Sequence, residues 1–274
     1  MAGGRAAAVV FAIHLAGLGA GAQALSVLPV NIFLQPGQKA TTLTVTNQGT
    51  SSTAIQIRGY AWSQKTGVGE DELTASDDIV VSPPIATIPA GSTQVVRLIL
   101  RQSPLGQEGT YRILVDQIPP PAEPGVVHIV LRLSIPIFAQ PAARAVSHIL
   151  FHIERKDGKL FLVGVNDGTS HDVIRDIVLT TSDGQKLKED RGSSPYILAG
   201  TTRYWPLTVD ASPQQPQTQA QAQAEQKPET QPQPQPQPPP PPPPPPPPIS
   251  DTFQLTAHSI GGEIAQQVSV VAQP

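Results

Sequence analysis

The sequence predicts an all-β protein built from antiparallel β-sandwiches, because its apolar residues alternate with polar ones and turn sequences recur at short intervals. Successive side chains of a strand point to opposite faces, so a period of two indicates strands with one buried face. The alternating apolar residues are Leu43, Val45, Ile55, Ile57, Val96, Leu98 and Leu100. The turn sequences that separate these runs are Gln35–Gly37, Asn47–Gly49, Pro89–Gly91 and Pro104–Gly106. No long run of period 3.6 accompanies them, so short strands at this spacing favour a sandwich.

The 274 residues are enough for two such sandwiches, each near the size of an immunoglobulin-like domain. We predict a first domain over 25–140, a connection over 141–145 and a second domain over 146–274. The strands expected in the second domain are His148–Ile153, Lys159–Asn166, Val173–Thr181, Thr202–Val209, Thr252–Ser259 and Glu263–Val271.

A segment rich in glutamine and proline, 213–248, interrupts the second domain and ends in an unbroken proline run over 238–248. It holds too few apolar groups to offset the entropy of ordering it, so its glutamine-rich part is expected to be disordered. The proline run is expected to form a stiff polyproline II rod. Strand-like sequence resumes at Asp251, which makes the segment a loop insertion. It is interpreted either as a tolerated repeat expansion, or as a docking site or spacer.

The N-terminus has the pattern of a signal peptide over 1–24. Arg5 precedes the apolar stretch Ala6–Leu18, and Ala22–Ala24 fits a small-x-small cleavage site. The alternative is an uncleaved anchor, but the stretch is short for a membrane span. The protein is therefore expected to be exported to the periplasm. It has no cysteine, so its stability must come from core packing.

Composition and motifs argue against an enzyme. With 18 basic and 21 acidic residues, the chain has no electrostatic footprint for nucleic acid or an anionic membrane. Motifs for a serine nucleophile or a phosphate loop are absent, and no catalytic residue, cofactor or metal is predicted. His148 and His152 are interpreted as a surface pair rather than metal ligands. The acidic residues Glu70, Asp71, Glu72, Asp77 and Asp78 are interpreted as a solvated loop rather than a calcium site.

One run of alternating residues, 126–138, is unusually long, and we expect it to form a single strand. The residues expected on its aliphatic face are Val127, Ile129, Leu131, Leu133 and Ile135. Pro136 lacks an N–H for one neighbour, which suits a sheet edge. A long apolar edge is an aggregation hazard unless something uses it. Taken alone, the run fits either an ordinary core strand or an edge lent to another protein.

Several motifs together resemble the periplasmic pilus chaperones, the PapD-like family. In order along the chain they are Leu43–Asn47, Ser82–Gly91, Val96–Leu98, Tyr111–Pro120, Arg132–Phe138 and, more weakly, Ser259–Gly262. The strand containing Leu133-Ser134-Ile135-Pro136 is similar to that of the archaic branch, which serves spore-coat-U-like pili. The resemblance spans nearly all of the chain from Leu25 to Gly262, apart from the insertion.

The resemblance implies two immunoglobulin-like domains set at an angle around a cleft. It also implies a function: the last strand of the first domain is lent to a pilus subunit, which is then delivered to an outer-membrane usher. Strand addition of this kind supplies main-chain hydrogen bonds to the open edge of the partner. The subunit-binding residues implied here are Val127, Ile129, Leu131 and Leu133.

The chain departs from the family pattern at the positions that clamp the subunit's C-terminal carboxylate. The family's arginine and lysine are replaced by Asn31 and Pro136, neither of which is cationic. Arg132, on the same strand face as Pro136, is interpreted either as a substitute anchor or as a solvent-facing arginine. Arg97 matches an arginine that bridges the domains in the family, while its usual acidic partners are replaced by Gln117 and Ser259. An exported structural or adhesive sandwich with no client remains the alternative, and an extracytoplasmic hydrolase is a third.

Overall fold

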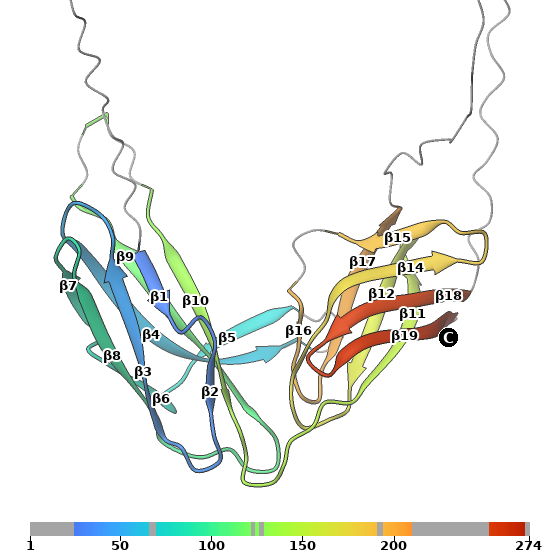
Figure 1. Ribbon diagram of the computed structural model, residues 1–274, viewed down its shortest axis with the longest axis horizontal. Coiled ribbons are helices and arrows are strands. Elements are labelled where there is room, and N and C mark those ends of the chain that lie inside the picture. Colours follow the sequence, from blue (N-terminus) through green and yellow to red (C-terminus); the bar gives the residue numbers. More distant parts are fainter. Residues whose placement is uncertain are drawn as a thin grey trace, which may run out of the picture. The chain divides into compact units, whose positions relative to one another are not determined.

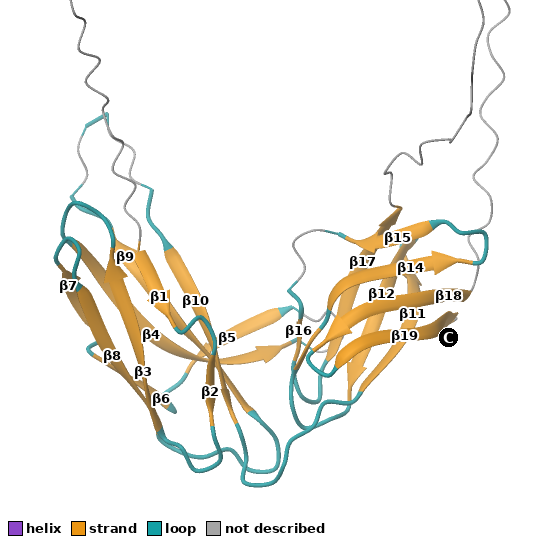
Figure 2. Ribbon diagram, viewed as in Figure 1, coloured by secondary structure: helices purple, strands orange, loops and turns teal. Residues whose placement is uncertain are grey.

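The computed structural model describes residues 25–65, 70–121, 124–125, 129–190, 194–209 and 252–271, which form strands, turns and loops (Figures 1 and 2). The predicted signal peptide, the predicted insertion and Val127 lie outside the described residues. Within those that are described, no helix is long and apolar enough to cross a membrane. The chain divides into two compact units, the second of which contains 63–72 and 106–108 as well as 144–274.

The first unit is a sandwich of two sheets, formed by the strands β1 to β10 of Figure 1. Its strands are β1 (Leu25–Leu28), β2 (Ile32–Leu34), β3 (Ala40–Asn47), β4 (Thr53–Gln64), β5 (Asp71–Ala75), β6 (Ile79–Ser82), β7 (Ile85–Ile88), β8 (Thr93–Leu100), β9 (Gly109–Ile118) and β10 (Arg132–Ala139). One sheet has the order β1-β3-β8-β6. The other has the order β2-β10-β9-β4-β5, with β7 on β4.

The core of the first unit is made by the residues that the alternation predicted. The seven apolar residues from Leu43 to Leu100 are all at most 1% exposed. They meet Ile113 and Val115 of β9 and Ile135 and Ile137 of β10 in a single cluster. The period of two therefore identified the inward faces of β3, β4 and β8 correctly.

The second unit closes into a barrel with the order β11-β12-β17-β15-β14-β18-β19. Its strands are β11 (Ile149–Lys156), β12 (Lys159–Asn166), β13 (Asp172–Val173), β14 (Arg175–Thr181), β15 (Lys186–Glu189), β16 (Tyr196–Ile197), β17 (Thr202–Val209), β18 (Thr252–Ser259) and β19 (Gly262–Val271). The ring closes where β11 pairs in parallel with β19 at Ile153 and Glu154. Trp205 is its largest fully buried side chain. A Cβ on Gly164 would meet the Trp205 ring at 2.9 Å, so this β12 position suits glycine.

Buried polar contacts hold 63–72 and 106–108 within the second unit. The Gln64 side chain donates to the Tyr196 carbonyl at 2.9 Å and accepts from the Leu198 N–H at 3.0 Å. Glu108 accepts from the backbone N–H of His171 at 2.9 Å, and its Oε2 lies 2.6 Å from the His171 ring Nδ1. All of these groups are partnered, as buried polar groups must be.

Several strand predictions need correction. The single strand expected over 126–138 begins only at Arg132, and 129–131 lie outside any strand. The strand expected over Val173–Thr181 is broken at Ile174, where the chain passes from β13 to β14. Asp176 has a positive φ of 53°, and the pairing with β18 shifts register there. Several strands were not predicted. β15 is highly charged and β16 has two residues. Asp71 and Glu72, interpreted as part of a solvated loop, lie in β5, which has no buried face to mark it because all five of its residues are exposed.

Candidate functional site

One edge of β10 is open over most of its length. On one side, β9 pairs with β10 along its whole span, Arg132–Ala139. On the other side, β2 pairs in parallel only with Ile137–Ala139. In the described part of the chain, no strand pairs with the remaining edge from Arg132 to Pro136. Pro136 supplies no N–H, which accords with the edge position expected for it.

The aliphatic face of this region passes from buried to exposed toward the N-terminal end. Ile135 is 3% exposed, and Leu133 is half-buried against the core. Two residues earlier Leu131 is 37% exposed, and Ile129 is 86% exposed. We call Ile129–Leu131 the leading segment. It continues the apolar pattern of β10, but its aliphatic side chains lie outside the core of the first unit. Val127, the fourth residue predicted for this face, lies outside the described residues.

Gln117 of β9 holds the leading segment where it joins β10. The backbone N–H of Gln117 donates to the Leu131 carbonyl at 2.9 Å. The Leu131 N–H in turn donates to Gln117 Oε1 at 3.3 Å. The side chain is only 6% exposed, and its Nε2 donates to Thr53 Oγ1 of β4 at 3.1 Å. Leu131 is thus held by both the main chain and the side chain of Gln117, and Ile129 lies beyond this contact.

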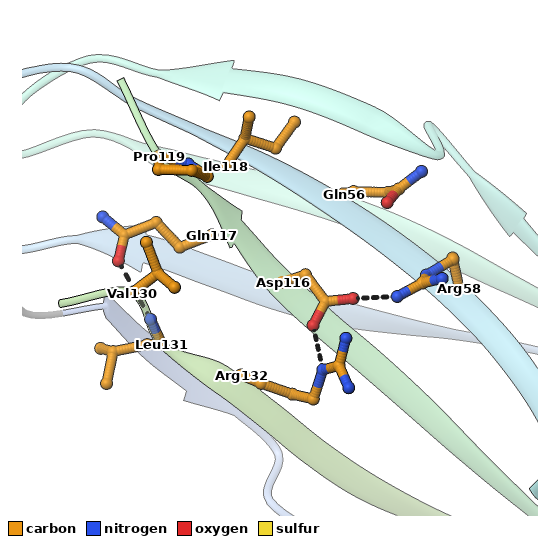
Figure 3. Close-up of a pocket in the computed structure, with 9 residues that line it drawn as sticks. All are labelled: Gln56, Arg58, Asp116, Gln117, Ile118, Pro119, Val130, Leu131 and Arg132. Carbon is orange, nitrogen blue, oxygen red and sulfur yellow. Dashed lines mark hydrogen bonds and ion pairs between the residues drawn. The ribbon is translucent and has the colours of Figure 1, made fainter. Parts of the chain in front are cut away.

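Asp116 lies between two arginines on the neighbouring strands (Figure 3). Arg58 Nη2 of β4 lies 2.6 Å from Asp116 Oδ2, and Arg132 Nε of β10 contacts Asp116 Oδ1. Burial raises the pKa of the Asp116 carboxyl, but the hydrogen bonds from Arg132 and Arg58 outweigh it. The pKa therefore lies below its ordinary value. The cluster keeps a net positive charge beside the leading segment.

A pocket of about 440 Å³ adjoins this cluster and the leading segment. It is lined by the residues drawn in Figure 3: Gln56, Arg58, Asp116, Gln117, Ile118, Pro119, Val130, Leu131 and Arg132. Its lining comes from β4, β9, the first residue of β10 and the leading segment. The pocket therefore combines the apolar side chains of Ile118, Val130 and Leu131 with the cationic Arg58 and Arg132.

The two positions expected to clamp a carboxylate lie beside each other. Asn31 and Pro136 precede Ile32 and Ile137, which pair in register between β2 and β10. Asn31 is exposed, whereas Pro136 is buried. Arg132, considered as a substitute, pairs with Asp116 four residues before Pro136, roughly 13 Å along an extended strand.

Sequence reasoning missed a second cation in this region. Arg112 of β9 lies directly opposite Pro136 in the ladder. Its guanidinium carbon is 3.7 Å from the centroid of the Trp62 ring. The Trp62 ring in turn lies 5.9 Å from the ring of Phe138. Arg112 was detectable as the polar residue between the buried Tyr111 and Ile113, but its place opposite Pro136 depends on strand register.

Gln117 and Ser259, predicted with Arg97 to act between the domains, make contacts within their own units. Arg97 of β8 is exposed, and its side chain makes no hydrogen bond or ion pair with other described residues. Gln117 holds the leading segment, as described above. The Ser259 hydroxyl donates to the Gly262 carbonyl at 3.0 Å in the turn between β18 and β19. Their inter-domain role stays a prediction.

His148, His152 and Asp71, which sequence analysis weighed as metal ligands, contact separate partners. His148 Nδ1 lies 2.5 Å from Asp167 Oδ1, and His152 Nε2 lies 3.0 Å from Glu154 Oε1. Asp71 accepts a hydrogen bond from Gln64 Nε2 at 3.0 Å. Over the described ranges, no group of three histidine, cysteine or acidic side chains is arranged to hold a metal.

Comparisons with known proteins match the first unit to a family model and the chain to solved structures of similar fold. Residues 24–145 match the family model for the pili and flagellar-assembly chaperone, PapD N-terminal domain. Among solved structures, the chain is similar to a chain of the CsuC–CsuE chaperone–tip adhesion subunit pre-assembly complex, from the archaic chaperone-usher Csu pili of Acinetobacter baumannii. The sequence identity is 19% and the TM-score 0.59, over 91% of this chain and 100% of that one.

Two further solved structures share the fold. The YadV chaperone is 14% identical, with a TM-score of 0.52 over 89% of this chain and 98% of that one. A chain from the Salmonella enterica SafA pilin complex with the SafB chaperone is 12% identical, with a TM-score of 0.52 over 91% of this chain and 97% of that one. A comparison with curated proteins found no match. Residues 24–145 therefore match the model of the PapD N-terminal domain of pili and flagellar-assembly chaperones, and the chain as a whole has the PapD-like fold, in agreement with the resemblance found in its motifs.

Proposed function

We propose that this protein is a periplasmic chaperone that binds an incomplete pilus subunit by adding a strand to it. The observation that carries the proposal is the open edge of β10, which continues into an exposed aliphatic segment. The family of the first unit is one of assembly chaperones, which agrees with the prediction of a protein without enzymatic activity. The similar CsuC–CsuE and SafB–SafA structures each contain a chaperone and a subunit, which supports a client of the same class.

Binding would combine main-chain pairing with burial of the aliphatic face. A subunit strand added beside Arg132–Pro136 would satisfy hydrogen-bonding groups that β2 does not reach. Burying Ile129 and Leu131 fully would contribute roughly 1.5–3 kcal/mol each, less whatever burial they already have. Leu133 contributes less because it already packs against the core of the first unit. Val127 completes the predicted face.

The terminal carboxylate of the client is expected to find a weaker anchor than in the family pattern. Asn31 and Pro136 supply no charge, and Arg132 is engaged by Asp116. Arg112, opposite Pro136, is the better-placed cation for this role. The apolar face is therefore proposed to carry most of the client's affinity.

Export and delivery complete the proposed pathway. Residues 1–24 are proposed to direct the chain to the periplasm, and an outer-membrane usher is proposed to receive the loaded subunit. The similarity to a structure from archaic Csu pili supports the archaic branch. The alternative is a structural or adhesive sandwich with no client, in which β10 would serve only its own core.

The test is co-expression with a pilus subunit from which its own N-terminal donor strand has been deleted. Ile129→Glu and Leu131→Glu should each reduce recovery of the complex at least tenfold, because a carboxylate would be buried in the subunit groove. Leu150→Glu is the matched control, since Leu150 is also exposed, at 52%, but lies on β11 of the closed barrel.

The folded state of each variant is checked by its thermal unfolding. If Ile129→Glu and Leu131→Glu form the complex as well as Leu150→Glu does, the proposal is wrong. It is also wrong if the wild-type protein fails to stabilise such subunits. Unfolding of Leu131→Glu alone would leave Ile129→Glu to decide, because the Ile129 side chain is almost fully exposed.

A further inference from the structure

We propose that Asp116 and Gln117 form a clamp that fixes the leading segment to β9 and so sets the register in which β10 is offered to a client. This inference rests on the proposed function, and it assigns a positioning role to two residues that touch no client themselves. Gln117 was predicted to act between the domains. Within the first unit, its contacts place it at the junction of the leading segment and β10.

Gln117 holds Leu131 from the inner side of the sheet. Its side chain shares a face with Val115 and Ile113 and is nearly buried. The amide is used at both ends, because Oε1 accepts from the Leu131 N–H while Nε2 donates to Thr53 Oγ1. Thr53 is itself buried at the start of β4, so it fixes the orientation of the amide. Leu131 is thereby tied to a strand one further into the sheet.

Asp116 holds the next residue from the outer side. Adjacent residues of a strand point to opposite faces, so Asp116 and Gln117 grip β10 from opposite faces of the sheet. Asp116 pairs directly with Arg132 in the ladder, and Arg58 stabilises the carboxylate from β4. Figure 3 shows the contact of Asp116 with Arg132 and the hydrogen bond of Gln117 with Leu131, at neighbouring positions of β9. A clamp of this form restricts sliding and twisting of the chain at the same point.

The position of the clamp determines which side chains reach a client. A slip of one residue would exchange the faces, presenting Val130 in place of Ile129 and Leu131. Val130 lies on the opposite face, is much less exposed than Ile129 (46% against 86%), and lines the pocket beside Arg58. The clamp ends at Leu131, so Ile129 extends beyond it with its aliphatic side chain exposed. The segment is thus fixed in register at one end and free to enter a groove at the other.

Amide hydrogen exchange on the free protein tests the clamp without any client. Gln117→Ala should accelerate exchange at the Leu131 N–H by about three- to tenfold, because one hydrogen bond is lost. Gln117→Glu should restore protection, since its carboxylate still accepts from that N–H. Thr53→Val removes the hydrogen bond that orients the amide but leaves the Oε1 acceptor in place, so it should accelerate exchange at Leu131 less than Gln117→Ala does. Exchange at Ile135 and Ile137 should change in none of these variants.

A register measurement then separates positioning from simple stability. In an otherwise wild-type protein, Ile129→Glu should impair binding of the strand-deleted subunit at least tenfold more than Val130→Glu. In a Gln117→Ala, Asp116→Ala background this ratio should fall to about threefold or less, because alternative registers become accessible. A merely structural role would weaken both variants equally and leave the ratio unchanged.

The two measurements fail separately. If Gln117→Ala leaves Leu131 exchange within twofold of wild type, the clamp is overturned whatever the client does. Gln117→Ala could accelerate exchange at Leu131 while the ratio of the effects of Ile129→Glu and Val130→Glu does not fall. In that case the clamp exists but its role in setting the register is overturned. If neither Ile129→Glu nor Val130→Glu affects subunit binding, the proposed function fails while the clamp stands as a local structural feature.

Discussion

The two units of this protein differ in whether the edges of their sheets are paired. In the first, β10 is paired along one side, and none of the described strands pairs with Arg132–Pro136 on the other. In the second, β11 meets β19 in parallel, and the seven strands close into a ring. Unpaired edges invite association with other chains, and closure is the most complete way to remove them. Because the second unit has a closed sheet, the open edge of β10 in the first unit is best explained as a binding site for another chain.

Exposed aliphatic side chains alone do not distinguish the two units. Leu150 of the barrel is 52% exposed, and Leu131 of the leading segment is less exposed than that. The difference is the backbone beside them. Ile129 and Leu131 continue a strand whose edge is open, whereas Leu150 lies on a strand of a closed ring. A binding site thus needs both an apolar face and an edge that accepts a strand.

The largest effect expected on stability lies in the barrel. Trp205→Ala should lower the free energy of unfolding of the second unit by about 3–5 kcal/mol, because Trp205 is fully buried. Ile129→Ala should change the stability of the first unit by no more than about 0.5 kcal/mol. Calorimetry, analysed for two transitions, measures both. Comparable losses in the two variants would show that the leading segment is part of a core.

A smaller loss is expected from the buried polar contact in the second unit. Glu108→Ala removes the acceptor that lies within 2.6–2.9 Å of the ring and backbone nitrogens of His171. The expected cost is about 1–3 kcal/mol, measured by urea unfolding. Lys65→Ala is the control, because its ion pair with Glu70 is exposed and is worth under about 1 kcal/mol. Equal effects would contradict the importance assigned to burial.

The pH dependence of stability should report on the paired carboxylate of Asp116 beside the open edge. The pKa of Asp116 is lowered in the folded state, so its contribution to stability is present above the ordinary aspartate pKa of about 4. It is lost as pH falls through the lower folded value. Asp116→Asn should therefore be less stable than wild type at neutral pH, and the difference should shrink below pH 4. A difference that grows on acidification would contradict the paired geometry.

The smallest effect is expected from the proline-rich insertion. Deleting 213–248 shortens one loop of the second unit, which should change the free energy of unfolding by less than about 1 kcal/mol. Subunit complex formation should be unchanged. If delivery to an usher fails while the complex still forms, the insertion is a docking element and not a tolerated expansion.

Much of the fold was predictable because burial follows the period of two. Leu43, Val45, Ile55 and Ile57 lie where the alternation placed them. The start of β10 was not predictable, because alternation reports an amphipathic face and not the presence of a ladder. The apolar pattern runs back through Ile129, yet the strand begins at Arg132.

Sequence analysis missed Arg112 and the contact of Gln117 with Leu131, and both depend on cross-strand register. Gln117 faces Leu131, and Arg112 faces Pro136, only because β9 and β10 pair as they do. A long proline-containing connection joins these strands, so no tight turn fixes their register in the sequence. The roles assigned to Gln117 by resemblance and by geometry therefore differ, although its polar character was visible from the start.

Site-specific photo-crosslinking from the leading segment tests the central claim most directly. A photoreactive residue at Ile129 should crosslink efficiently to a co-expressed pilus subunit that lacks its own donor strand. The same residue at Leu150, on the closed barrel, should give at most background crosslinking. Equal crosslinking from both positions, or none from Ile129 while a complex is recovered, would contradict the claim that the open edge of β10 holds the client.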